Sequence, residues 1–454
     1  MILHSTICKS FGMVLFFCAS LIGCGGGGGS DTTTDTDAPT SNPTTKAGAK
    51  SKPNILLIIA DDMGLDATPG YSEGTQKPKM PVLQSLSTSG ITFDNLWVNP
   101  LCAPTRATIL TGKYGINSGV TGVQSGNNGI STSETSLQSY LTNNSTYNSA
   151  IIGKWHLSNN SNGGSDNPAQ MGVEHYEGLL SGAHEDYSNW ALTKNGITST
   201  VQQYSTSYFT DKAIDWVSEQ QDPWFLWLAY TAPHTPFHLP PTDLHSSDDL
   251  PNTKDDINAN PLDYYLAALE ALDTEMGRLL KTIDMDNTIV IFIGDNGTPK
   301  RVIQSPFTKN QAKGSVYEGG IHVPMIISGA GVTKSGAREA ALINSTDLFT
   351  TITDIAGTGL VKHHDSQSFK DMLTGTQQDT REFIYTEISD STNAWAIRDS
   401  QYKLITLDEG FQEFYDLNSD PYEKNDLTSG TLSSIQTQAK NKLEGLASTV
   451  RQGK

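Results

Sequence analysis

Apolar runs of strand length recur along the chain from residue 53, and segments with helical periodicity lie between them. Runs without polar alternation are typical of strands buried on both faces. The runs are Asn54–Ala60, Ser149–Ile152, Trp224–Ala229, Thr288–Gly294 and Val323–Ser328. The helical segments are Val82–Ser89, Ser207–Glu219, Asp263–Ile283 and Thr346–Ile355. The alternation predicts an α/β fold with a large mixed, mostly parallel sheet sandwiched by helices.

The pattern changes after about residue 365. Short strand-like pieces follow one another there, and a helical segment, Ser433–Val450, comes after them; the pieces read FIYTEI, AWAIR, YKLITL and EFYDL. Successive short strands favour an antiparallel sheet. We therefore predict a large α/β domain over residues 53–365 and a smaller C-terminal α+β domain over residues 366–454.

The first 52 residues have the character of an export and anchoring segment. Residues 1–23 carry Lys9 and then an apolar run, Met13–Ile22, that is too short to span a bilayer. The sequence LIGC that ends at Cys24 resembles the bacterial lipobox, which implies cleavage before Cys24 and lipidation of its thiol. An ordinary signal peptide cut within the glycine run is the alternative. Residues 24–52 are rich in Gly, Ser, Thr and Asp, as in a flexible tether. We expect an exported bacterial lipoprotein, held to the membrane by its N-terminal lipid.

The net charge argues against one class of function, and the cysteine content singles out one residue. A net charge of −19 argues against nucleic-acid binding, which needs a basic face. Cys102 is the only cysteine after Cys24, so the mature protein has no disulfide. It stands in PLCAPTRATILTG, where Pro104 suits the first turn of a helix and Arg106 follows one turn on. A helix N-terminus favours an anion, so Cys102 is either chemically special or a small buried hydrophobe.

Acids, cations and imidazoles follow the predicted strands, where the carboxyl ends of parallel strands meet. The oxygen-bearing residues are Asp61, Asp62, Asp295 and Asn296. Oxygen ligands with three negative charges suit a hard divalent cation, Ca²⁺ or Mg²⁺. The residues that could hold an anion or move a proton are Lys154, His156, His234 and Lys313. Taken singly, each acid could be a helix or turn cap and each base a solvated or structural side chain.

From about Pro53 to Asp426 the chain resembles a type I sulfatase of the alkaline phosphatase superfamily. Cys102-Ala103-Pro104-Thr105-Arg106 is similar to the family signature, with Thr105 in place of the usual serine. A second signature runs from Tyr147 to His156, with Thr146 in place of the usual glycine. Further matching segments are Ala232–Pro236, Gly294–Gly297, Lys313-Gly314, Glu318–Gly320, Tyr415–Leu417 and Asp420-Pro421.

The resemblance implies a mechanism. A formylglycine-generating enzyme would oxidise Cys102 to formylglycine, whose hydrate attacks sulfur with one hydroxyl and expels sulfate with the other. The cation, expected to be Ca²⁺ with Mg²⁺ as the alternative, would be held by Asp61, Asp62, Asp295, Asn296 and the group formed at Cys102. The remaining roles are diol orientation for Arg106, sulfate binding for Lys154 and Lys313, base for His156, and acid for His234 with Lys313.

Two other functions remain open. One is hydrolysis of phosphonate or phosphate esters within the same superfamily, and the other is non-catalytic binding of sulfated glycans by a lipoprotein. The expected substrate is a sulfated polysaccharide or oligosaccharide. By the resemblance, variable loops form the leaving-group pocket; the candidates are Ser158–Trp190, with Glu174, His175, His184 and Trp190, then Phe237-His238 and Lys300-Arg301.

Overall fold

A computed structural model of the chain describes residues 52–124, 128–376 and 381–452. The predicted signal segment and all but the last residue of the predicted tether lie outside this range. Among the described helices, none combines the length and the apolar character needed to cross a membrane.

Eleven strands form one large sheet, in which ten follow the order β10-β2-β9-β8-β1-β7-β3-β4-β5-β6 and β11 pairs with β2. At its centre, β1 (Asn54–Ala60) pairs in parallel with β7 (Trp224–Ala229) and β8 (Thr288–Gly294). Parallel pairing continues from β7 to β3 (Asn148–Gly153). The carboxyl ends of these strands therefore lie at one edge of the sheet, as the sequence predicts.

Antiparallel strands complete the sheet. β9 (His322–Gly329) runs antiparallel to β8 and to β2 (Ile91–Trp97), and β5 (Trp190–Lys194) runs antiparallel to β4 (His175–Gly178). β6 (Ile197–Val201) runs antiparallel to β5, whereas β10 (Ala337–Glu339) and β11 (Ile343–Asn344) pair in parallel with β2. The predicted mixed, mostly parallel sheet is confirmed.

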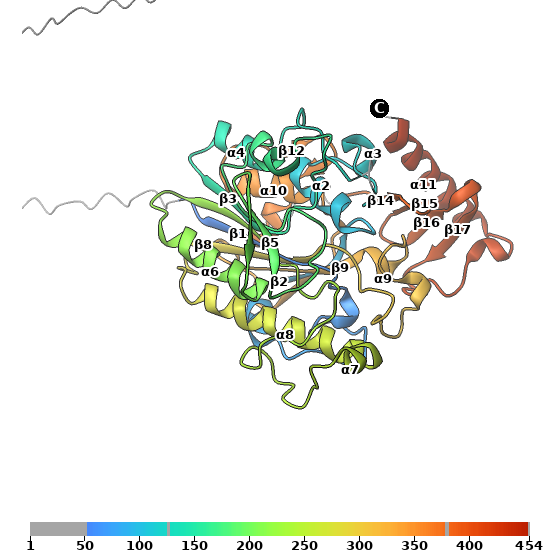
Figure 1. Ribbon diagram of the computed structural model, residues 1–454. Coiled ribbons are helices and arrows are strands. Elements are labelled where there is room, and N and C mark those ends of the chain that lie inside the picture. The colour runs from blue at the N-terminus through green and yellow to red at the C-terminus, as the bar shows by residue number, and fades with distance from the viewer. Residues whose placement is uncertain (1–51, 125–127, 377–380, 453–454) are drawn as a thin grey trace, which may run out of the picture. The chain divides into compact units, whose positions relative to one another are not determined.

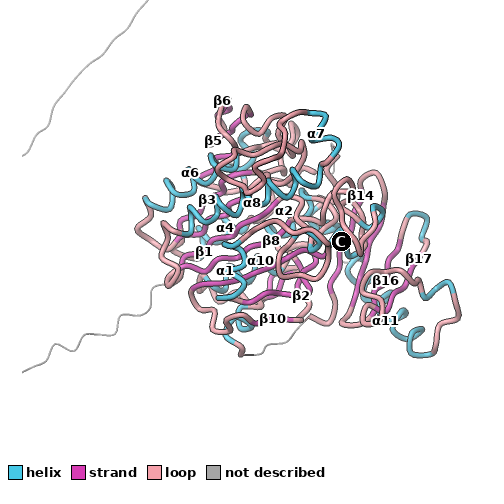
Figure 2. Tube along the Cα trace, turned by 90° about the horizontal axis from the view of Figure 1, so that it is seen from below, coloured by secondary structure: helices cyan, strands magenta, loops and turns pink. Residues whose placement is uncertain are grey.

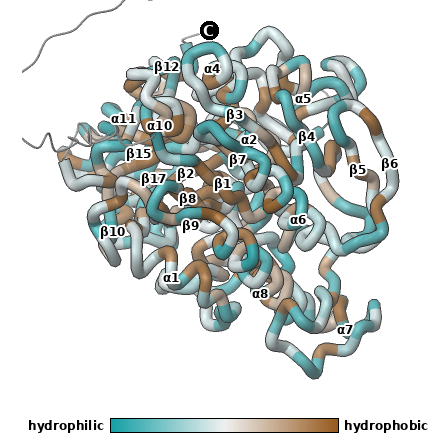
Figure 3. Tube along the Cα trace, turned by 90° about the vertical axis from the view of Figure 1, so that its left-hand side faces the viewer, coloured by the Kyte–Doolittle hydropathy of each residue, from teal (hydrophilic) through white to brown (hydrophobic). Residues whose placement is uncertain are grey.

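Helices cover both faces of the sheet (Figure 1). Successive side chains of a strand point to opposite faces, and Ile55 and Leu57 of β1 belong to one hydrophobic core while Leu56 and Ile58 belong to another. The first core packs under α2 (Cys102–Thr111), α4 (Leu137–Asn144) and α10 (Asp347–Ile355). The second packs under α1 (Pro81–Ser89), α6 (Ser205–Ser218) and α8 (Pro261–Leu280). In Figure 3 the central strands are accordingly the most hydrophobic part of the trace.

The C-terminal part forms a second, four-stranded antiparallel sheet beside the large one (Figure 2). Its strands are β14 (Ile384–Ser389), β15 (Asn393–Arg398), β16 (Tyr402–Thr406) and β17 (Gln412–Asp416). Leu443 and Ala447 of α11 (Ser434–Gln452) are buried in a core shared with this sheet. The predicted C-terminal α+β region is confirmed. The boundary at residue 365 stays a prediction, and a small hairpin of β12 (Lys362–His363) and β13 (Ser366–Gln367) spans it.

Short helices connect these elements. The α-helical ones are α3 (Gly115–Ser118), α5 (Asn167–Gln170), α7 (Lys254–Ala259) and α9 (Glu318–Ile321). The 3₁₀ turns are η1 (Leu65–Ala67), η2 (Gly164–Asp166), η3 (Lys309–Gln311), η4 (Lys370–Thr374), η5 (Asp408–Gly410) and η6 (Leu427–Ser429).

Candidate active site

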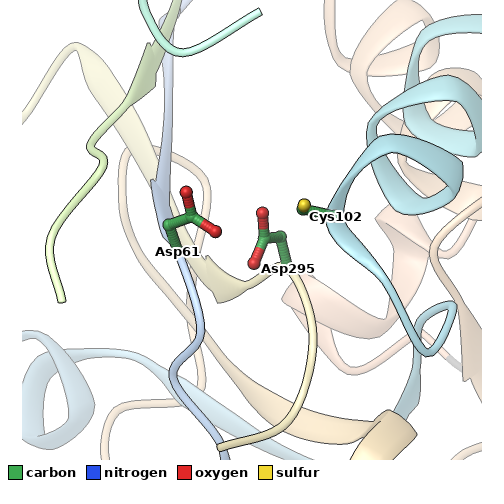
Figure 4. Close-up of side chains that lie close together, drawn as sticks. All are labelled: Asp61, Cys102 and Asp295. Atoms are coloured by element: carbon green, nitrogen blue, oxygen red, sulfur yellow. The ribbon is translucent and has the colours of Figure 1, made fainter. Parts of the chain in front are cut away.

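The predicted site residues meet where the central strands end and α2 begins. Asp61 follows β1, Asp295 follows β8, and Cys102 is the first residue of α2. In Figure 4 their side chains gather in the space between the strands and that helix. The Cys102 sulfur and one oxygen from each of the two carboxylates lie within 4.8 Å of one another.

Cys102 is buried, and its sulfur lies 3.2 Å from Nδ1 of His156. Leu101 is extended and precedes the helix, so the chain enters α2 with the Cys102 side chain in its first turn. Burial raises the pKa of the Cys102 thiol, against the opposing effect of Lys154 and Lys313. The unmodified thiol is therefore a weak nucleophile at neutral pH, because the thiolate is the reactive form.

Thr105, which stands in place of the usual serine, uses its hydroxyl group to hold the start of α2. Its Oγ1 accepts a hydrogen bond from the backbone N–H of Asn99 at 2.9 Å and lies 3.3 Å from the carbonyl oxygen of Leu101. The hydroxyl thus ties the chain before α2 to the first turn of the helix, and the substituted methyl group is accommodated in a fully buried position.

Three carboxylates and three cationic side chains balance one another in the site. Arg106 donates to Asp295 Oδ2 through Nε and Nη2, at 3.2 and 2.7 Å, and to the Lys154 carbonyl at 2.7 Å. Lys154 Nζ lies 2.5 Å from Asp61 Oδ2, and Lys313 Nζ lies 2.5 Å from Asp62 Oδ1. A divalent cation added to this balanced set would give the site net positive charge, which favours an anionic substrate.

The oxygen atoms of the site fit a hard cation. Among the described residues, Asp61 Oδ1 and Asn296 Oδ1 are buried without a hydrogen-bond partner, an arrangement that is costly unless something else satisfies them. Burial and the neighbouring Asp295 raise the pKa of Asp61 to about 7. Burial also opposes ionisation of Asp62, but Lys313, His234 and Lys154 together lower its pKa to about 2. A bound cation would stabilise the ionised Asp61 and accept its free oxygen.

The two histidines differ in their contacts. His156 faces the sulfur, whereas His234 Nε2 lies 3.8 Å from Asp62 Oδ2 and its Nδ1 lies 2.7 Å from the Thr235 carbonyl. Burial is the main cause that lowers the pKa of His156 well below its usual value and that of His234 to about 3. Both imidazoles are neutral at pH 7. By contrast, contacts with Asp62 outweigh burial and raise the pKa of Lys313, which remains an ammonium.

The backbone is unusual at two site residues. Asp62 has φ of 75° and His156 has φ of 61°, in the left-handed region that residues other than glycine seldom adopt. Tyr265 of α8 donates through its hydroxyl to the Asp62 carbonyl at 2.8 Å. Gly182 packs on the ring of His156 so closely that an added Cβ would lie 2.4 Å from Nε2. The sequence motifs indicated neither Tyr265 nor Gly182 as a residue of the site.

The expected substrate-pocket residues have varied positions. Trp190 and His184 belong to a buried aromatic cluster with Tyr187 and Phe209, so their rings pack in the core. His175 opens β4, close to Glu177 and beside Trp216 of α6. Glu174 and Lys300 are exposed. The Arg301 guanidinium lies over the ring of Phe237, and the His238 ring stacks on Tyr187.

Comparisons with known proteins agree with this geometry. A family model described as Sulfatase matches residues 53–358, and one described as N-sulphoglucosamine sulphohydrolase, C-terminal, matches residues 310–449. The first match covers more than half of the chain. The protein therefore belongs to the sulfatase family, a family of sulfuric ester hydrolases.

Curated relatives and solved structures extend the comparison. The uncharacterized sulfatase YdeN of Escherichia coli is 28% identical over 70% of this chain, which spans 65% of the YdeN length. An ulvan-active sulfatase of Formosa agariphila is 27% identical, over 83% of this chain and 77% of its own. The crystal structure of Ps i-CgsB in complex with k-i-k-neocarrahexaose is 25% identical with a TM-score of 0.74, covering 87% of this chain and 93% of that chain.

Proposed function

We propose that the protein releases inorganic sulfate from a sulfated polysaccharide or oligosaccharide, with residue 102 as formylglycine and Ca²⁺ as the metal. The observation that carries the proposal is the position of Cys102. A buried thiol with a raised pKa, at a helix N-terminus and beside the carboxylates of Asp61 and Asp295, is a poor nucleophile as it stands. The surrounding groups are those that an oxygen nucleophile and an anionic ester require.

Formylglycine and the cation supply chemistry that the unmodified side chains do not have. Formylglycine, once formed from Cys102, supplies a hydrate hydroxyl as nucleophile and a second hydroxyl for release of sulfate. The cation, held by Asp61, Asp62, Asp295 and Asn296, supplies positive charge where negative charge develops. The unpartnered oxygens of Asp61 and Asn296 support this choice of ligands.

The chain's own residues do the rest. Neutral His156, whose Nδ1 faces residue 102, accepts a proton from the group at that position. Arg106 is held by Asp295 and orients the neighbouring hydroxyls. His234, together with Lys313, donates a proton to the leaving oxygen, while Lys154 and Lys313 bind the sulfate oxygens.

The substrate class and location are part of the proposal. The relatives named above include an ulvan-active sulfatase and a structure bound to a neocarrahexaose, so we infer a sulfated glycan as substrate. We further propose that Cys24 carries a lipid and anchors the enzyme to a bacterial membrane, on the periplasmic face or at the cell surface.

The experiment is a sulfate-release assay after co-expression with a formylglycine-generating enzyme. The panel contains ulvan, carrageenan and glycosaminoglycan fragments, together with an aryl sulfate and an aryl phosphate. Sulfate release by the wild type and none by Cys102→Ala supports the proposal. Faster cleavage of the phosphate ester than of every sulfate ester would indicate a phosphoesterase instead.

A further inference from the structure

Residues 179–189, the segment between β4 and β5, contact the surroundings of both histidines of the site. Gly182 packs closely on the ring of His156. Further along the segment, the Tyr187 hydroxyl oxygen lies 2.6 Å from the carbonyl oxygen of His234. One short segment therefore lies against both residues that the proposed function uses for proton transfer.

His234 lies in a tight turn that follows β7. Its N–H donates to the carbonyl oxygen of Thr231 at 2.8 Å, and this hydrogen bond closes the turn. The Asp61 N–H donates to the carbonyl oxygen of Ala232 at 3.2 Å, so the turn is also fixed to the end of β1. Because the His234 side chain leaves the main chain at one end of the turn, a shift of the turn moves the imidazole.

The Tyr187 hydroxyl joins the two ends of this turn. It donates to the Thr231 carbonyl at 2.8 Å and to the His234 carbonyl at 2.6 Å, sharing its proton between them. Burial raises the pKa of Tyr187 well above its usual value, so the hydroxyl keeps the proton that it donates. The His238 ring stacks on the Tyr187 ring with centroids 3.8 Å apart, and His184 Nε2 lies 2.9 Å from Thr231 Oγ1. The contacts of Tyr187 therefore fix the turn from the side opposite to β1.

We propose that Tyr187 is a positioning residue for the proton donor His234. The inference rests on the proposed function, in which the S–O bond breaks and the leaving oxygen takes up the bonding electron pair and a proton. Loss of the hydroxyl leaves buried carbonyl groups without a donor, so the turn is expected to shift. Proton transfer depends on hydrogen-bond reach between donor and acceptor, and a small displacement slows it.

The test compares two sulfate esters that differ in their need for a proton. A sugar alcohol is a weak acid and leaves with a proton, whereas a nitrophenol is acidic enough to leave as its anion. Tyr187→Phe, which removes only the hydroxyl, should lower kcat about tenfold on a sulfated oligosaccharide and less than about twofold on nitrophenyl sulfate. The matched control is Tyr230→Phe, also at the end of β7, which removes a buried hydroxyl that lies 2.7 Å from Thr210 Oγ1 of α6. It should leave the ratio of the two kcat values unchanged.

A double-mutant cycle tests whether Tyr187 acts through His234. In a His234→Ala background, Tyr187→Phe should lower kcat on the sulfated oligosaccharide less than about twofold, because the group that it positions is gone. A merely structural role would give the same loss in both backgrounds. Tyr187→Met, which also lacks the hydroxyl, repeats the comparison with a second side chain.

The outcomes separate the two proposals. Equal losses on both esters, equal losses in both backgrounds, or a wild-type kcat in Tyr187→Phe overturns the positioning role and leaves the sulfatase activity standing. A loss confined to the oligosaccharide and to the background that contains His234 supports it. No sulfate release by the wild type from any compound, with the formylglycine present, overturns the proposed function itself.

Discussion

Removal of the metal is expected to lower stability in a pH-dependent way. A ligand that binds only the folded state stabilises it by about 2.7 kcal/mol at one hundred times its Kd. A fold of about 400 residues has an unfolding entropy near 0.8 kcal/mol/K, at about 2.1 cal/mol/K per residue. Saturation with Ca²⁺ at that excess should therefore raise the melting temperature by about 3 °C at pH 8.

The pH dependence follows from Asp61. Without a cation its pKa is raised from 3.8 to about 7 by burial and Asp295, so the cation-free protein loses stability as pH rises from about 4 to about 7. Ca²⁺ must displace this proton below pH 7, and the apparent affinity should fall about tenfold between pH 8 and pH 6. At the same Ca²⁺ concentration the thermal gain at pH 6 should be about half of that at pH 8, since tenfold in affinity is about 1.4 kcal/mol.

The assay is thermal unfolding with and without Ca²⁺ after exhaustive chelation, at both pH values. Asp61→Asn should lose most of the Ca²⁺ effect. Asp273→Asn changes a buried aspartate of α8 that accepts hydrogen bonds from the N–H groups of Val82 and Leu83. It should lower the melting temperature and keep the Ca²⁺ gain. An unchanged melting curve with full activity after chelation would refute the metal assignment, and a larger gain at pH 6 would refute the role of Asp61.

Three further changes test single contacts. Gly182→Ala should displace the His156 ring and lower kcat tenfold or more with little change in melting temperature. The control is Gly445→Ala in α11, where an added Cβ meets no atom within 4 Å, and it should leave kcat unchanged. A wild-type kcat in Gly182→Ala would contradict the role of the close Gly182–His156 contact. Cys102→Ser should give at most one turnover in a burst assay, because one hydroxyl cannot both attack and expel sulfate, and repeated turnover would show that water releases it. Lys403→Met removes the buried ammonium held by Glu318 and Glu423 at 2.9 and 2.6 Å and should cost about 3–5 kcal/mol in urea unfolding; a loss below 1 kcal/mol would contradict that account.

The central strands could be predicted from the sequence because each is a continuous apolar run without the periodicity of a helix. β1, β7 and β8 have the bounds that their apolar runs indicate, since strands buried on both faces must be continuously apolar. The hairpin of β5 and β6 was not predicted. Residues 197–200 of β6 are exposed, so the alternation that would mark a half-buried strand is absent.

The active site also has residues that the sequence could predict and residues that it could not. Residues that directly follow the strands, such as Asp61 and Asp295, could be placed together from topology alone. Tyr265 could not, because it reaches the Asp62 carbonyl from α8, 203 residues later in the chain. Trp190 was expected near the substrate, but its ring packs against Phe209 and Tyr208. Local sequence does not distinguish an aromatic residue of the core from one of a pocket.

The most direct test of the central claim joins two readings on one sample. The protein is co-expressed with a formylglycine-generating enzyme at several levels, and the tryptic peptide from Met80 to Arg106 is analysed by mass spectrometry for aldehyde or thiol at residue 102. Sulfate release is expected to rise in proportion to the aldehyde fraction and to vanish when residue 102 is entirely thiol. Equal sulfate release by protein with only the thiol would contradict this expectation.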